Sequence, residues 1–153
     1  MTNCIVRDAE PADSALIAAY IHKLAAFENL ADTVKINEQT VRKDFFEQGL
    51  TGAVIVEKDG TSAGFAVYYY IYSTFAGKPS LYVEDIFIDE QFRHQGLAHE
   101  VFRSLARKAS ERGCIRLQWS VLEWNTNAIT FYRSIGGTHR KDWQTWYLEL
   151  HAD

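Results

Sequence analysis

Two adjacent carboxylates stand in the middle of an apolar stretch, and that position makes them candidates for chemistry. Residues Leu81–Ile88 read LYVEDIFI, with Glu84 and Asp85 at the centre. A strand that is apolar on both sides is normally central in its sheet and covered on both faces. An unpaired carboxylate there is costly or has a shifted pKa. Glu84 is therefore a candidate proton acceptor, and a carboxylate at a solvated strand position is the alternative.

Strict alternation along this strand predicts which side chains share a face. Asp85 is then expected on the face opposite Glu84, where it either attracts a substrate or pairs with a basic side chain. The apolar residues divide in the same way, with Tyr82, Ile86 and Ile88 on one face and Leu81, Val83 and Phe87 on the other.

The turn that follows the strand has the composition of an anion-binding loop. It reads Arg93-His94-Gln95-Gly96-Leu97-Ala98 and leads into an amphipathic helix. Free backbone N–H groups at a helix N-terminus bind phosphate, and a glycine allows close approach. The turn is neither a Walker loop nor a GxGxxG fingerprint. The hexapeptide alone fits a pyrophosphate site and an ordinary strand-to-helix connection equally well.

The remaining pattern predicts the elements that must position these residues. Strands are expected at residues 3–8, 53–58, 62–72, 81–88, 115–121 and 143–150, the last closing the sheet, with Asp59-Gly60 as a hairpin turn. Helices are expected at about 11–29, 37–48, 97–112 and 125–135. Hairpins require antiparallel pairs and the long crossover helix favours a parallel pair, so the sheet is mixed.

Composition restricts the class of protein. The chain has 153 residues, 47% of them hydrophobic, which is the size of one domain with one core. Its net charge of −4 argues against nucleic acid and permits a cationic ligand. No apolar run is long enough for a membrane span. Cys4 and Cys114 have no metal or redox spacing and the five histidines are scattered, so we expect a reduced cytoplasmic protein without a metal site.

Several motifs in order resemble one enzyme family. Arg93-x-x-Gly96-x-Ala98 fits the [QR]xxGx[GA] motif of the GNAT superfamily of acetyl-CoA-dependent N-acetyltransferases. LYVEDIFI, RHQGLA, EWN at 123–125, FYR at 131–133 and Trp146 are similar to the spermidine/spermine branch and its thialysine N-acetyltransferase relatives. The resemblance covers nearly the whole chain. It implies a single α/β (α+β) domain over residues 1–153, with a mixed, mostly antiparallel sheet of about seven strands, splayed centrally, and about four helices.

The resemblance also implies how acetyl-CoA is held. Backbone groups of Ile86, Phe87 and Ile88 would pair with the pantetheine arm as an added strand does. The pyrophosphate would lie on the loop and helix start, and the far end of the arm on the second motif. The implied cofactor residues are Arg93, His94, Gln95, Gly96, Leu97, Ala98, His99, Asn125, Thr126, Asn127, Ala128 and Tyr132. Asn125 is equally suited to be a helix N-cap.

Acetyl transfer to an amine needs a proton acceptor for the ammonium and a proton donor for the leaving thiolate. Glu84 suits the first task, directly or through a water. Tyr132 stands where the relatives place the proton-donating tyrosine, although a Phe-Tyr pair in a helix is often only core. The implied substrate positions are Phe27, Glu28, Ser73, Glu84, Asp85, Gln118, Trp119, Ser120 and Gln144.

Departures from the polyamine enzymes bear on the substrate. Phe27 replaces a family tyrosine, Gln144 replaces an acid, and Ser73 stands where those enzymes carry an aspartate. Fewer acidic groups favour a lysine-like terminal amine, such as that of thialysine, over a polyamine. A protein or peptide amine is an alternative substrate, and a non-catalytic acyl-CoA sensor is an alternative function. The family further implies a homodimer.

Overall fold

The computed structural model describes residues 3–150. The chain divides after Ser120 into two compact units, each described by itself below. We call them the first unit, which ends at Ser120, and the second unit, which begins at Val121. Among the described residues, no helix combines the length and the hydropathy that a membrane crossing requires.

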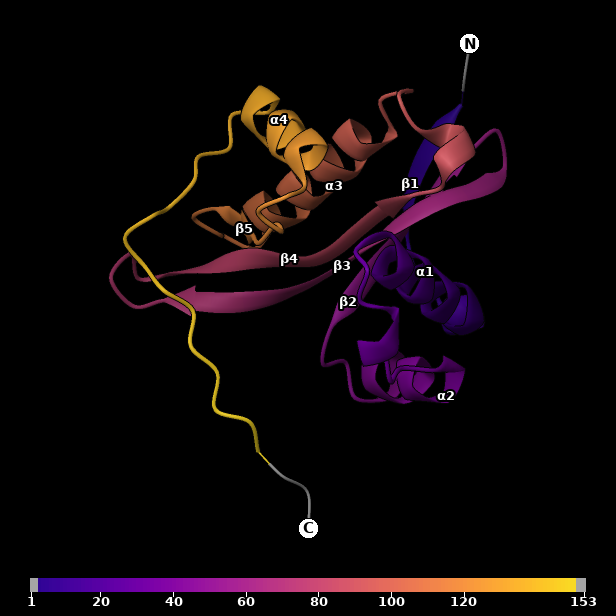
Figure 1. The fold of residues 1–153 in the computed structure, drawn as a ribbon, viewed down its shortest axis with the longest axis horizontal. Helices are drawn as coiled ribbons and strands as arrows, with labels where there is room; N and C mark the ends of the chain where they lie inside the picture. Colours follow the sequence, from indigo (N-terminus) through magenta and orange to yellow (C-terminus); the bar gives the residue numbers. More distant parts are fainter. Residues whose placement is uncertain (1–2, 151–153) are drawn as a thin grey trace. The chain divides into compact units, whose positions relative to one another are not determined.

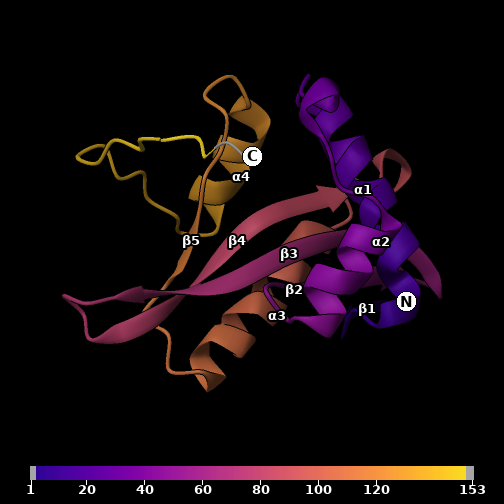
Figure 2. The ribbon, with the colours of Figure 1, turned by 90° about the horizontal axis from the view of Figure 1, so that it is seen from below.

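The first unit is built on a five-stranded sheet in the order β1-β2-β3-β4-β5. Neighbouring pairs among β1 to β4 are antiparallel, and β5 runs parallel to β4. Figure 2 shows β3 and β4 as the long central ribbons. The bounds are Cys4–Asp8 for β1, Gly52–Lys58 for β2, Thr61–Ser73 for β3, Lys78–Ile88 for β4 and Leu117–Trp119 for β5.

Helices cover both faces of this sheet (Figure 1). On one face lies α3, Leu97–Glu111, whose buried stripe of Leu97, Val101, Leu105 and Ala109 packs against β2, β3 and β4. On the other face, α1 and α2 share a second apolar cluster with β2, β3 and β4. The remaining helical bounds here are Ser14–Phe27 for α1, Glu38–Val41 for α2, a π-helix at Arg42–Glu47 and short 3-10 helices at Pro11–Asp13, Ala31–Thr33 and Glu90–Phe92.

Most of the expected elements are confirmed where local signals were strong. Asp59 and Gly60 both have positive φ, 49° and 83°, as a tight hairpin between β2 and β3 requires. Asn37 caps α2 by accepting a hydrogen bond from the Thr40 backbone N–H at 2.9 Å. The helix expected over 37–48 is present but changes from α to π at Arg42.

A β-bulge in β4 overturns the expected alternation. Val67 of β3 pairs with Asp85, whereas the next residue, Tyr68, pairs with Val83, so Glu84 is an extra residue on β4. The extra residue shifts the phase of the strand. Before it, Leu81 and Val83 face α3; after it, the residues that face α3 are Ile86 and Ile88, and Phe87 turns toward α1. The expected grouping of Phe87 with Leu81 and Val83 is therefore wrong.

The parallel pair β4–β5 is short and ends beside the bulge. It comprises only Leu81↔Leu117, Tyr82↔Gln118 and Val83↔Trp119. From Glu84 to Ile88, no strand of the described chain pairs with this edge of β4, whose other edge is bonded to β3. The strands that flank α3, β4 and β5, thus part beyond Val83 as the resemblance implies, but they are the last pair of the sheet rather than its centre.

Three strand predictions need correction. The sheet has five strands rather than about seven, and the strand expected at 115–121 is confined to Leu117–Trp119. Residues 143–150 form no strand, and Trp146, Tyr147 and Leu148 are exposed. Alternating apolar and polar residues indicate a segment that one face of a sheet could bury. A strand also needs a neighbouring strand to pair with its backbone N–H and C=O groups.

The second unit contains α4, Thr126–Ser134. Asn125 is its N-cap, and its Oδ1 accepts a hydrogen bond from the Ala128 backbone N–H at 3.3 Å. The Gly137 backbone N–H donates to the Tyr132 carbonyl at 2.9 Å and satisfies a carbonyl at the helix end. The helix expected at 125–135 is confirmed.

Candidate active site

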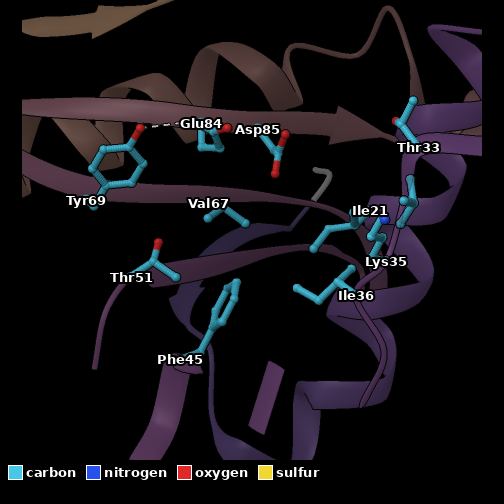
Figure 3. A pocket seen from close by; sticks show the side chains of 11 residues that line it. Ile21, Thr33, Lys35, Ile36, Phe45, Thr51, Val67, Tyr69, Glu84 and Asp85 are labelled. Atoms are coloured by element: carbon cyan, nitrogen blue, oxygen red, sulfur yellow. Dashed lines mark hydrogen bonds between the residues drawn. The ribbon is translucent and has the colours of Figure 1, made fainter. Parts of the chain in front are cut away.

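A pocket of about 420 Å³ opens on the face of the first unit that carries α1 and α2. Figure 3 shows Glu84 and Asp85 entering from β4, Val67 and Tyr69 from β3, and Lys35 and Ile36 from the α1–α2 connection. The other lining residues are Ile21, Thr33, Val34, Phe45 and Thr51. The helical side of the pocket is therefore mainly apolar but carries Lys35, and the β4 side is acidic.

Glu84 and Asp85 lie in the same pocket, although strict alternation would place them on opposite faces. The bulge is the reason, because its extra residue lets two consecutive side chains project to one side of the strand. The expectation that Asp85 points away from Glu84 is therefore wrong. The pair can act on one ligand.

A tyrosine positions Glu84. The Tyr69 hydroxyl donates a hydrogen bond to Glu84 Oε2 at 3.1 Å. The Tyr69 ring stacks on Tyr82 with centroids 5.2 Å apart, and the Tyr82 hydroxyl lies 2.8 Å from Ser120 Oγ. This chain of contacts holds the exposed Glu84 side chain toward the pocket. Burial and the nearby Glu84 charge raise the pKa of Tyr69 to about 12, so the phenol stays a donor.

Asp85 is the perturbed acid of the site. Burial, then the charges of Glu84 and Glu28, raise the pKa of Asp85 to about 7. Burial also raises the pKa of Glu28, which follows the last residue of α1. Titratable groups with such shifts in a pocket are typical of functional sites. The charges of Glu84 and Glu28 thus act on Asp85, and a cationic ligand would relieve that repulsion.

The loop before α3 leaves backbone N–H groups at the helix start without a side-chain cap. Gly96 is the N-cap of α3 with φ of 81°, and no side chain caps the helix. A Cβ at Gly96 would meet nothing within 4 Å, so the space in front of the loop is open. Lys58 Nζ donates to Gln95 Oε1 at 2.6 Å and adds a positive charge beside the loop. These observations fit the group, because uncapped N–H groups and a cation both stabilise phosphate.

Arg93 ties this loop to the strand and to α1. Its Nε donates to the Ile88 carbonyl at 2.9 Å, and its guanidinium lies 5.3 Å from the Phe27 ring and 5.4 Å from the Phe87 ring. Arg93 therefore positions the loop rather than projecting into open space. Ile86, Phe87 and Ile88 lie on the unpaired stretch of β4, where an extended pantetheine arm could add as a strand.

Other predicted residues of the first unit lie apart from the pocket. Trp119 packs against Phe102 under α3, with centroids 5.1 Å apart, and Gln118 is exposed on β5. Ser73 lies at the far end of β3, where its Oγ accepts from the Ala76 backbone N–H at 3.3 Å. Ser73 pairs with Lys78, and six residues of extended chain, about 20 Å, separate Lys78 from Glu84.

The residues predicted in the second unit fall on α4 and on the segment after it. Thr126, Asn127 and Ala128 form the first turn of α4, and Tyr132 lies in its last turn with its ring 5.8 Å from that of Phe131. Gln144 is exposed, and its Oε1 accepts from Trp146 Nε1 at 3.1 Å. None of these positions tests the role predicted for it.

Sequence reasoning missed Tyr69 and Lys35. A signal existed for Tyr69, because a tight β3–β4 hairpin places Tyr69 opposite Tyr82 and so close to Glu84. No pattern identifies Lys35, which stands in an irregular connection. Within residues 3–150, no group of three or more His, Cys, Asp or Glu side chains could hold a metal ion.

Comparisons with known proteins agree with this geometry. The model of the acetyltransferase (GNAT) family matches residues 16–136. A thialysine N-epsilon-acetyltransferase of Caenorhabditis elegans is 34% identical, covering 96% of this chain and 91% of the relative. The Sus scrofa protein of the same name is 30% identical and covers 99% and 96%.

A solved aminoglycoside N-acetyltransferase in complex with CoA shares the fold, with a TM-score of 0.77 and 16% identity over 98% of this chain and 97% of that one. The family match covers most of the chain, and the relatives match over nearly their full length. The chain therefore belongs to the GNAT family and is an N-acetyltransferase that uses acetyl-CoA.

Proposed function

We propose that this enzyme acetylates the terminal primary amine of a small molecule, with a lysine-like amine such as thialysine as the preferred class. The observation that carries the proposal is the pocket in which Glu84 and Asp85 lie together on β4. Two carboxyl groups and the nearby Glu28 make a site for an ammonium group. The similarity to thialysine acetyltransferases supports the same class.

In this proposal, Glu84 accepts the proton of the bound ammonium, directly or through a water. The neutral amine then attacks the thioester carbonyl, so a C–N bond forms and the C–S bond breaks without an acetyl-enzyme. The hydrogen bond from Tyr69 orients Glu84 for this task. Asp85 attracts the ammonium when ionised.

Tyr132 is the proposed proton donor to the departing CoA thiolate. A phenol has an ordinary pKa near 10 and can serve as a general acid to a thiolate. The support for this role is the match of the FYR motif at 131–133 to the relatives. The proposal also keeps Asn125 to Ala128 as contacts of the pantetheine arm.

Two alternatives remain to be distinguished. The pocket is open to solvent, so its geometry admits the amine of a peptide as well as that of a small molecule, and the acceptor panel below distinguishes the two. A sensor of acyl-CoA has no use for a carboxylate that a tyrosine orients in the pocket. This contact favours an enzyme.

We also propose that the protein works as a homodimer, as the family implies. Within residues 143–150, Trp143, Trp146, Tyr147, Leu148 and Leu150 are exposed. Exposed apolar clusters of this kind are typical of protein–protein contacts. Light scattering coupled to size exclusion would decide between a monomer and a dimer.

The central test is a CoA-release assay with a panel of acceptors: thialysine, L-lysine, spermidine, spermine and short lysine peptides. The proposal expects the highest kcat/KM with thialysine or lysine. A clear preference for peptides would contradict it. Binding of acetyl-CoA with no turnover on any acceptor would favour the sensor.

The proposed phosphate site at the α3 N-terminus predicts that the same substitution at two glycines of similar conformation has different effects on acetyl-CoA affinity. Gly96 and Gly113 stand at opposite ends of α3 with φ of 81° and 76°, and a Cβ at either meets nothing within 4 Å. Gly96→Glu should weaken acetyl-CoA binding on titration calorimetry by at least about tenfold, because it puts a carboxylate at the phosphate site. Gly113→Glu, with the same backbone strain and charge, should leave affinity unchanged. Equal affinities in both folded variants would refute the phosphate site.

Removal of the Tyr132 hydroxyl should slow chemistry without loosening the cofactor. Tyr132→Phe keeps the ring, so we expect turnover to fall about 10²-fold while acetyl-CoA affinity changes little. Tyr147→Phe is the control, since Tyr147 is an exposed tyrosine of the same unit. The measurement is single-turnover acetyl transfer by rapid quench. Wild-type turnover in Tyr132→Phe would exclude the hydroxyl from the mechanism.

The raised pKa of Asp85 predicts opposite effects on activity and stability. Asp85 becomes an anion only as the pH rises through about 7, so kcat/KM should rise there and Asp85→Asn should lose that inflection. A carboxyl whose pKa is higher in the folded state than in the unfolded state makes folding less favourable as pH rises between the two values. Asp85→Asn should therefore have a higher Tm than wild type above pH 7, and the gain should shrink toward acidic pH. Asp142→Asn, an exposed acid, should change neither profile.

A further inference from the structure

Lys35 brings a positive charge to a pocket whose other charged residues are both acidic. Of the eleven lining residues, Glu84, Asp85 and Lys35 are the charged ones. Figure 3 shows Lys35 beside Thr33 and Ile36 on the α1–α2 connection, whereas the acids come from β4. No ion pair joins Lys35 to either acid. The pocket thus keeps opposite charges apart across its width.

The other side-chain donors that line the pocket are hydroxyl groups, and each of them already donates a hydrogen bond within the described chain. The Thr33 hydroxyl donates to the Leu30 carbonyl at 2.6 Å, and the Thr51 hydroxyl donates to the Tyr68 carbonyl at 2.7 Å. The Tyr69 hydroxyl donates to Glu84. Lys35 makes no hydrogen bond or ion pair with the described residues. An anionic group of a ligand would therefore find its partner at Lys35.

The backbone that carries Lys35 is anchored on both sides. Ile36 packs against the apolar cluster between the sheet and α1, and its carbonyl oxygen lies 3.0 Å from His22 Nε2. On the other side, Thr33 is the last residue of a 3-10 helix, and its hydroxyl donates a hydrogen bond to the Leu30 carbonyl. The Lys35 side chain is flexible, but the backbone that carries it is held at the pocket.

We propose that Lys35 binds the α-carboxylate of an amino-acid acceptor whose side-chain amine is acetylated at Glu84. The inference rests on the proposed function and names the residue that selects the substrate class. An amino acid with a terminal amine carries a cation at one end and a carboxylate at the other, which matches the two sides of the pocket. A polyamine carries only cations, so Lys35 repels its distal amine.

A pair of acceptors that differ only by the carboxylate isolates this contact. Thialysine and bis(2-aminoethyl) sulfide share every group except the carboxylate, and wild type should prefer thialysine. In Lys35→Met, which keeps the apolar stem, kcat/KM for thialysine should fall about tenfold, mainly through KM. Turnover of the sulfide diamine and of spermidine should stay level or rise. Lys35→Glu should reverse the preference.

Lys43→Met is the matched control, because Lys43 is exposed on the π-helix and does not line the pocket. It should leave both acceptors unchanged. An equal loss for thialysine and the diamine in Lys35→Met would overturn the inference and assign Lys35 a structural role. Calorimetric binding of the two acceptors with CoA present gives the same comparison without turnover. If wild type turned over neither acceptor, the proposed function would be refuted. The calorimetric affinities of the two acceptors would still show whether Lys35 binds the carboxylate.

Discussion

The extra residue at Glu84 in β4 is the constraint on which the site depends. A regular strand sends consecutive side chains to opposite faces, so Glu84 or Asp85 would lie under α3. The bulge against Val67 and Tyr68 puts both acids in the pocket and returns Ile86 and Ile88 to the core. One local irregularity therefore satisfies the core and the chemistry together. Bulges beside active sites commonly serve to redirect a side chain in this way.

In the proposed function, the cost of ionising the buried Asp85 carboxyl is what favours binding of an amine in this pocket. Desolvation and the charges of Glu84 and Glu28 make an ionised Asp85 unfavourable in the free enzyme. A bound ammonium would offset part of that cost by pairing with the Asp85 carboxylate, so the charge that disfavours folding would favour binding. Activity and stability are expected to oppose each other at such a residue. Tyr69 adds orientation, because its hydroxyl holds Glu84 while its ring rests on Tyr82.

The two edges of β4 differ in how far they are paired with neighbouring strands. One edge of β4 is bonded to β3 along its length, and the other is paired with β5 only as far as Val83. The unpaired part leads directly into the loop at Arg93 and the uncapped start of α3. Backbone groups for an extended arm and N–H groups for a phosphate are thus continuous along the chain. Glu84 and Asp85, which line the pocket, directly follow Val83, the last residue of β4 that pairs with β5.

The sequence by itself determined the elements with strong local signals and the family. The Asp59-Gly60 hairpin, the apolar stripe of α3 and the Asn125 cap are written in neighbouring residues, and the ordered motifs identify a GNAT enzyme. Tertiary structure alone decided the rest. The bulge at Glu84 depends on the register with β3, so alternation misplaced Asp85 and Phe87. The short β5 and the unpaired residues 143–150 depend on partner strands that no local pattern reveals. Lys35 joins the site only because the α1–α2 connection is held against the pocket, a contact between residues far apart in sequence.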